Sequence, residues 1–286
     1  MNFMRYKYLF FALSVVLIIP GLIFLFTSGL KLGIDFTGGG LLEYKFSQPV
    51  TKEQLDKYGV VTSSGDNAYI IRTSPQEFDQ LQQLRQEIAS SSGAFETLRE
   101  ENVGPTIGKE LEQRASIAIA LAILAILAYV TLAFRKVPKP TSSWRFGVAT
   151  IVALVHDVLF VLGLFAILGH YFHVEIDVLF VTAMLTIIGF SVHDTIVVFD
   201  RIRENLTKYS GRKFDEIANI SVGQTLARSL NTSLTVVFVL VALLLFGGDT
   251  IKWFVVALLA GMISGTYSSI FNATALLAYW EEKLGH

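Results

Sequence analysis

The sequence contains no cysteine, which excludes disulfide bonds, thiolate chemistry and cysteine-ligated zinc sites. Charged residues are also scarce, at 16% of the 286 residues, whereas hydrophobic residues make up 52%. The formal net charge is -1, so the charge balance gives no indication of nucleic acid as the main partner. The apolar residues are gathered in long runs, which is typical of a protein embedded in a lipid bilayer.

Four runs without Lys, Arg, Asp or Glu each reach the roughly 20 residues that cross the hydrocarbon core. They are residues 8–30, 115–134, 229–248 and 253–280. Two further runs, residues 146–168 and 176–199, are as apolar except for one His-Asp pair in each. A cleaved signal peptide is the alternative for residues 1–30, but the run is too long for a signal core. We therefore predict a retained first helix and six transmembrane helices.

Basic residues are concentrated before the first span and in two of the short loops, which predicts that these segments are cytoplasmic. They are Arg5, Lys7, Arg135, Lys136, Lys139, Arg145, Arg201, Arg203, Lys208, Arg212, Lys213 and Arg228. Both termini are then cytoplasmic, and residues 200–228 form a cytoplasmic loop. Within that loop, residues 214–228 have a partly apolar face, so we expect them to lie along the inner membrane surface.

Residues 31–113 interrupt the membrane pattern and are polar, with more acidic than basic side chains. Alternating apolar residues predict strands at residues 41–46, 68–72 and 94–99. Helical spacing predicts helices at residues 50–59 and 74–89, and Thr51 is placed to cap the first of them. The sequence thus predicts one small extracytoplasmic α+β domain, followed by a five-helix bundle in residues 114–286.

Glycines mark both ends of this domain, in GIDFTGGG (residues 33–40) and in VGPTIGKEL (residues 103–111). A glycine cluster can cradle phosphate when it follows a strand and opens a helix. Here the first cluster follows a membrane helix and leads into a strand. We therefore predict turns or hinges at Gly38, Gly39 and Gly104.

Two His-Asp pairs, His156 with Asp157 and His193 with Asp194, lie inside predicted membrane helices. A charge at this depth costs upward of about 2.5 kcal/mol on insertion scales, so it needs a partner or a function. One interpretation is structural, with each pair bonded to a neighbouring helix. The other is a proton pathway through the membrane. For His156 and Asp157 the sequence does not distinguish the structural interpretation from the proton pathway.

Asp194 is the favoured candidate for a proton-binding switch, and Arg228 is the favoured candidate for its regulator. Asp194 lies five residues before the end of its span, which is about 8 Å along a helix axis. Arg228 stands just before the fifth span, on the same side of the membrane. Burial favours a neutral carboxyl group and a nearby guanidinium favours a charged one, so movement of Arg228 would load and release a proton.

Enzyme chemistry fits the sequence poorly. A metal site on a helix needs ligands three or four residues apart, and neither membrane helix with a His-Asp pair has two histidines at that spacing. Ser191 and His193 are two residues apart, so they point to different faces of a helix and do not form a nucleophile and base. We predict no enzymatic activity, no metal site and no cofactor.

The last two predicted spans contain small and polar residues that favour close packing. Gly261 and Gly265 have the GxxxG spacing that lets two helices approach each other. Asn231, Thr232 and Asn272 are secondary candidates for the polar pathway.

Four motifs are distributed along the whole chain. They are GIDFTGG (33–39), VGPTIGKEL (103–111), VHDTIVVFDRIREN (192–205) and RSLNTS (228–233). Together they resemble the SecF members of the SecD/SecF family of bacterial protein translocase subunits. This family is related to resistance-nodulation-division transporters. The resemblance implies a ferredoxin-like periplasmic domain and a location in the bacterial inner membrane. It assigns the proton-path acid to Asp194 and the corresponding arginine to Arg228.

The same resemblance implies partners and a source of energy. The partners would be SecD, the SecYEG channel, a preprotein substrate and the lipid bilayer. The protein would use the proton-motive force, and thus the movement of protons, to drive late steps of export after SecA has acted. From the residues alone, a proton-coupled exporter of small molecules and a non-transporting scaffold of the translocase remain as alternatives.

Overall fold

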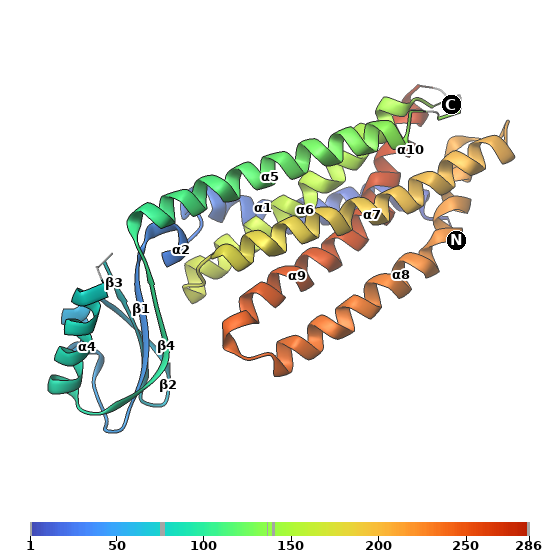
Figure 1. The fold of residues 1–286 in the computed structure, drawn as a ribbon. Coiled ribbons are helices and arrows are strands. Elements are labelled where there is room, and N and C mark those ends of the chain that lie inside the picture. Colours follow the sequence, from blue (N-terminus) through green and yellow to red (C-terminus); the bar gives the residue numbers. More distant parts are fainter. Residues whose placement is uncertain (1, 75–77, 136, 139–140, 285–286) are drawn as a thin grey trace. The chain divides into compact units, whose positions relative to one another are not determined.

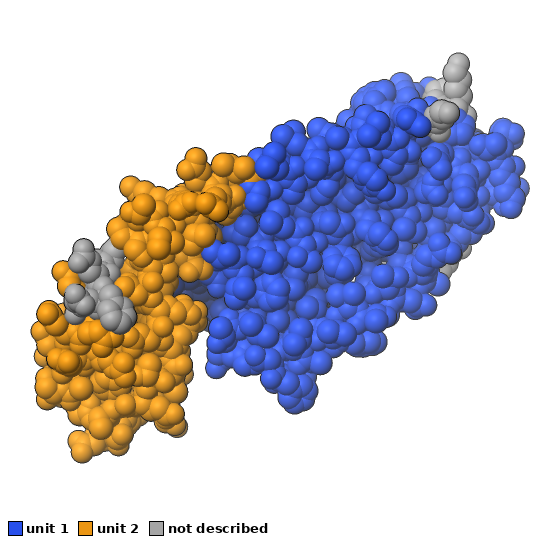
Figure 2. All heavy atoms as spheres, in the orientation of Figure 1, with its two compact units in different colours: residues 1–31, 118–286 blue, residues 32–117 orange. Residues whose placement is uncertain are grey.

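The chain divides into two compact units in the computed structural model, which describes residues 2–74, 78–135, 137–138 and 141–284. The larger unit comprises Met1–Lys31 and Ala118–His286, and the smaller comprises Leu32–Ile117 (Figure 2). The larger unit is helical, and the smaller contains the only sheet of the described residues (Figure 1).

Six helices of the described chain are long and apolar enough to cross a membrane. They are α1 (Lys7–Thr27), α5 (Pro105–Ala133), α6 (Ser143–Phe172), α7 (Val178–Lys208), α8 (Phe214–Phe246) and a last span that runs through α9 (Asp249–Tyr267) and α10 (Ala273–Lys283). A π-helical turn, Ser268–Asn272, joins α9 to α10. The predicted fold class, mainly α-helical with six candidate spans and a small α+β part, is confirmed.

The predicted loop at residues 200–228 is wrong. Helix α7 continues to Lys208 and α8 begins at Phe214, so residues 209–213 alone connect them. Phe214, Ile217 and their neighbours on α8 are buried in one hydrophobic cluster with residues of α7. The apolar face that suggested a surface helix therefore packs against another helix, and this segment and the fifth span form one continuous helix, α8.

Small residues set how closely the membrane helices pack. A Cβ atom built on Gly21 of α1 would lie 2.6 Å from the Cα atom of Gly163 on α6. A Cβ atom on Gly261 of α9 would lie 2.4 Å from the side chain of Ile187 on α7. Because glycine has no Cβ atom, these overlaps do not arise, and the helices can pack in close contact.

The smaller unit has the chain order β1 (Gly39–Phe46), α3 (Lys52–Leu55), β2 (Val60–Gly65), β3 (Ala68–Thr73), α4 (Phe78–Ser92) and β4 (Phe95–Val103). The strands are antiparallel in the order β2-β3-β1-β4. This is the βαββαβ arrangement of ferredoxin-like domains. Leu42, Tyr44 and Ile71 are fully buried in its core, together with Leu55 and Ile88 from the two helices.

Local signals explain most of this domain. Thr51 and Gln54 form a capping box at the start of α3, and Gly59 ends the following turn at a φ of 152°. Strand β2 was not predicted, because only Val61 of its six residues is buried and no alternating pattern results. The predicted start of the helix at 74–89 falls on residues 75–77, which lie outside the described residues.

Candidate functional site

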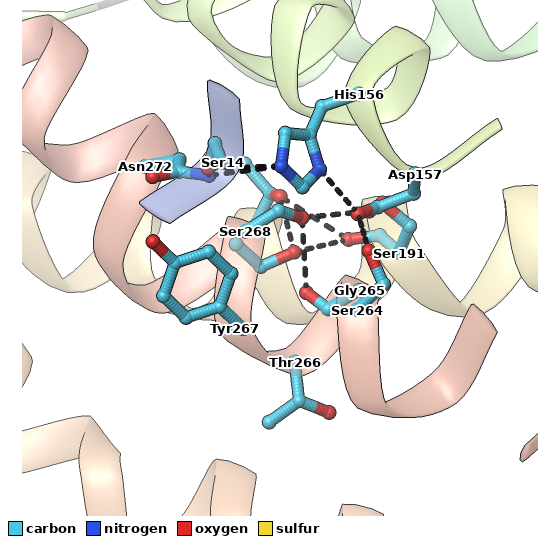
Figure 3. A network of polar contacts seen from close by, with 12 residues as sticks. Ser14, His156, Asp157, Ser191, Ser264, Gly265, Thr266, Tyr267, Ser268 and Asn272 are labelled. Atoms are coloured by element: carbon cyan, nitrogen blue, oxygen red, sulfur yellow. Dashed lines mark hydrogen bonds and ion pairs between the residues drawn. The ribbon is translucent and has the colours of Figure 1, made fainter. Parts of the chain in front are cut away.

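Asp157 lies at the centre of a network of polar side chains inside the helical bundle (Figure 3). Its side chain is 0% exposed. Oδ1 lies 3.0 Å from Nδ1 of His156 and accepts a hydrogen bond of 2.8 Å from Ser264. Oδ2 accepts hydrogen bonds of 2.6 Å from both Ser191 and Ser268. An ionised carboxylate has about four acceptor sites, and four neighbours occupy them here.

His156 continues the network toward α1 and the π-helical turn. Its Nε2 atom lies 3.0 Å from Oγ of Ser14 and 3.3 Å from Nδ2 of Asn272. Nδ2 of Asn272 also donates to Oγ of Ser14 at 2.6 Å. An amide nitrogen only donates, so with the Asn272 amide in this orientation Nε2 of His156 accepts and Nδ1 donates to Oδ1 of Asp157.

The helices place these residues by simple periodicity. Ser264, Ser268 and Asn272 are spaced by four residues, so they follow one face of the last span. The backbone packs closely here: a Cβ atom on Gly265 would lie 3.5 Å from Oδ2 of Asp157, which is ordinary van der Waals contact. The network is thus assembled from four separate elements, namely α1, α6, α7 and the last span.

A cavity of about 650 Å³ lies between α1, α6 and α10. Its wall is mainly apolar and aromatic, and Ser14, His156 and Asn272 are among the lining residues. The Asp157 network therefore borders this cavity on its His156 side.

Asp194 has a different and sparser environment. It is 6% exposed and accepts a hydrogen bond of 3.3 Å from Ser233 on α8. Ser233 in turn accepts one of 2.7 Å from Thr266 on α9. Nδ1 of His193 lies 3.6 Å from the carboxylate, but the side chain of His193 is 64% exposed. No Lys or Arg pairs with Asp194 in the part of the chain that the structure describes.

Arg228 is not joined to Asp194 in this structure. Its side chain is exposed, and no hydrogen bond or ion pair links the two among the described residues. The contact between Ser233 and Asp194 shows why: Arg228 lies five residues before Ser233 on α8, which is about 7.5 Å of helix rise. An arginine side chain would have to reach along the helix to close this gap.

The other predicted residues are more scattered. Asn231 and Thr232 are exposed on α8, and Thr232 bonds only the backbone carbonyl of Arg228 among the described contacts. In the smaller unit, Gly38 and Gly39 adopt positive φ values of 71° and 126°, which favour glycine. Gly104 does not adopt a positive φ, and a Cβ atom there would meet open space.

Sequence reasoning missed Ser14, Ser233 and Thr266 as parts of these networks. Ser14 is a single hydroxyl group in an apolar run, and no spacing in the sequence connects it with His156. Ser233 lies in the hydroxyl-rich segment at 228–235, where the pattern does not say which side chain faces α7. The partners of both aspartates are set by packing between helices.

Comparisons with known proteins agree with this architecture. The family described as "Protein export membrane protein SecD/SecF, C-terminal" matches residues 83–283. The "SecD/SecF GG Motif" matches residues 23–50, which include Gly38 and Gly39. The chain belongs to the SecD/SecF family. The resemblance stated from the sequence motifs is thereby confirmed.

Relatives within the SecD/SecF family cover nearly the whole chain. Protein translocase subunit SecF of Thermobaculum terrenum is 48% identical over 99% of this chain and 94% of its own length. The SecF subunit of Anaerolinea thermophila is 45% identical over 98% of this chain and 94% of its own. Such translocase subunits are transport components and not enzymes. With six helices that are long and apolar enough to cross a membrane, this member of the family is a multi-pass membrane protein.

The fold is also that of a solved SecD/SecF structure. The crystal structure of SecDF from Thermus thermophilus, described as a translocon-associated membrane protein, matches with a TM-score of 0.84 at 34% identity. The match covers 99% of this chain but only 39% of the SecDF chain. This chain therefore spans well under half the length of that protein.

Proposed function

We propose that this chain acts with SecD to use the proton-motive force in late steps of preprotein export through SecYEG, after SecA has acted. The observation that carries the proposal is the environment of Asp194. This carboxyl group is buried within a candidate membrane span, it accepts from the hydroxyl group of Ser233, and no arginine or lysine of the described chain pairs with it. An intramembrane acid of this kind marks a proton relay more often than a structural contact.

Asp194 would alternate between a protonated and a charged state as the bundle changes conformation. Arg228, which is exposed and unpaired with Asp194 here, would stabilise the charged state when it approaches. A membrane potential of 100 mV supplies about 2.3 kcal/mol for each charge that crosses. That energy changes the ratio of two conformations by nearly fiftyfold, which is enough to bias a working cycle.

Orientation and partners complete the proposal. Both termini would lie in the cytoplasm and residues 31–113 on the outer side of the bacterial inner membrane, as the distribution of basic residues predicts. That domain would contact the emerging preprotein, with Gly38, Gly39 and Gly104 as hinges. His193 would orient Asp194, and Asn231 and Thr232 would lie beside the path near Arg228.

The test is export driven by a proton gradient in vesicles that contain SecYEG, SecA, SecD and this chain. Asp194→Asn keeps the size of the side chain but removes the titrating group, so we expect export to fall to the rate seen without a gradient. Arg228→Ala should weaken the same gradient-dependent part. Asp249→Asn, at an exposed aspartate of α9, is the matched control and should behave as the wild type.

Two outcomes would replace the proposal. If Asp194→Asn inserts normally and keeps full gradient-dependent export, Asp194 is not the proton carrier. If both variants are silent while omission of the chain stops export, the chain is a scaffold. Efflux of small molecules without SecD would instead favour the exporter.

A further inference from the structure

We propose that Asp157 is a second proton-binding carboxyl group, and that Ser268 accommodates its two protonation states by exchanging hydrogen-bond partners. The inference deepens the proposed function, since it adds a site to the proton path assigned to Asp194. It rests on the contacts of Asp157 in the described structure, and it is tested by a readout that does not depend on export.

The contacts of Asp157 in this structure suit a carboxylate that only accepts hydrogen bonds. Its two oxygen atoms accept from three serine hydroxyl groups and from His156, at distances of 2.6 to 3.0 Å. A protonated carboxyl group would have to donate one hydrogen bond, and none of these four contacts offers it an acceptor as drawn. Protonation of Asp157 therefore requires one neighbouring group to rotate so that it accepts a hydrogen bond from the carboxyl O–H.

Ser268 is the neighbour that can turn. Its Oγ atom lies 2.6 Å from Oδ2 of Asp157 and also 3.3 Å from the backbone carbonyl oxygen of Gly265. When a proton binds Oδ2, the hydroxyl hydrogen of Ser268 rotates to the Gly265 carbonyl, and Oγ accepts from the new O–H group. Within the described residues, Ser191 and Ser264 have no second acceptor for their hydroxyl hydrogens.

Protonation at the other oxygen requires more rearrangement. A proton on Oδ1 would face Nδ1–H of His156, so His156 would have to move its own proton to Nε2. Nε2 would then become a donor beside Nδ2 of Asn272, only 3.3 Å away, and the amide would have to rotate as well. The Oδ2 route needs one hydroxyl rotation, whereas the Oδ1 route needs a tautomer change and an amide rotation.

No fixed cation competes for Asp157 among the groups packed around it in the described chain. His156 on the same helix is the titratable group in contact, and the ring of Tyr267 on α9 lies 6.3 Å from the His156 ring. Asp194 on α7 bonds elsewhere. The charged side chains nearest in sequence on α1, α6 and α10 form ion pairs elsewhere: Lys7 pairs with Asp215 of α8 and with Glu282, and Arg145 pairs with Glu281.

The location of Ser268 also supports a local rearrangement at this contact. It opens the π-helical turn that joins α9 to α10. Such turns interrupt the regular hydrogen bonding of an α-helix and often occur at functional sites. A change in the contact between Ser268 and Asp157 would therefore act where the last span is least regular.

The experiment is an infrared titration of the full chain in lipid nanodiscs, in which protonated carboxyl groups give a separate C=O stretching band. We expect the wild type to show a band that Asp157→Asn removes and that Asp194→Asn retains. The control Asp249→Asn, at an exposed aspartate, should leave that buried band in place. An unchanged spectrum of a folded Asp157→Asn variant would overturn the proposal.

Two serine variants test the partner exchange and do not require removal of the carboxyl group. Ser191 donates to Oδ2, and this oxygen becomes a poor acceptor once it carries the proton, so Ser191→Ala should displace the titration midpoint by about one pH unit or more. Ser268 bonds both forms, so Ser268→Ala should displace it less. A displacement for Ser268→Ala as large as that for Ser191→Ala would refute the exchange.

The two proposals can fail separately. Normal export by Asp194→Asn would refute the proposed function but would leave the Asp157 band in place. Absence of that band would refute the second site, whatever Asp194→Asn does to export.

Discussion

The ion pair between Arg145 and Glu281 joins the start of α6 to the end of α10, and its disruption should destabilise the bundle. Nη1 of Arg145 lies 2.7 Å from Oε1 of Glu281, and the side chains are 15% and 0% exposed. The Glu281 carboxylate is fully buried, so water has little access to it. Arg145→Ala would leave a buried carboxylate without its cation, which typically costs about 3–5 kcal/mol.

The pair is not fully satisfied, which makes a second expectation possible. Oε2 of Glu281 and Nε of Arg145 have no hydrogen-bond partner within the described part of the chain. Apolar replacement of both residues removes the burial cost of two charges and these two unpaired atoms. The double variant with Arg145→Leu and Glu281→Leu should therefore recover most of the stability that Arg145→Ala loses.

Reversible unfolding of the purified protein in mixed micelles with increasing SDS would measure these differences. Arg114→Ala is the matched control, because Arg114 pairs with Glu110 one helical turn away and both side chains are more than half exposed. Its loss should stay below about 1 kcal/mol. The reasoning is refuted if Arg145→Ala costs no more than Arg114→Ala, or if the double variant is no more stable than the single one.

Two further predictions concern packing and pH. Gly21→Ala places a methyl group 2.6 Å from the Cα atom of Gly163 and should cost about 1–3 kcal/mol in the same unfolding assay, whereas Gly189→Ala, in open space, should cost nothing; equal losses would contradict the close helix contact. Burial, reinforced by Glu100, raises the pKa of Tyr44. Since the folded value exceeds the unfolded one, stability should fall as pH rises above about 10, and Tyr44→Phe should reduce that slope in alkaline unfolding measurements; an unchanged slope would argue against it.

Much of the architecture could be predicted from composition. Four of the six candidate spans followed from runs without charge and two from apolar runs with a His-Asp pair, because a bilayer tolerates few unpaired charges over the length of a helix. Two of the four strands were placed to within two residues, since alternating burial leaves a pattern in the sequence. Strand β2 was missed, because an exposed edge strand does not leave an alternating pattern of apolar residues in the sequence.

The segment before the fifth span was misassigned for a related reason. Phe214 and Ile217 form an apolar face, but an apolar face can be covered by lipid or by another helix, and the sequence alone does not distinguish these. The structure shows that helix α7, and not lipid, covers this face. The same ambiguity affected Asp157, which could have been either a structural contact or a functional group.

The sequence by itself determined that this chain spans a membrane, carries a small α+β domain and holds two aspartates at membrane depth. Hydrophobicity and periodicity are local properties, and each of these conclusions follows from them. The tertiary structure decided what those aspartates contact. It surrounds Asp157 with serines from α7 and the last span, and it gives Asp194 only a sparse contact with Ser233. These neighbours lie 34 to 111 residues apart in the chain, so only the packing of helices against one another could bring them together.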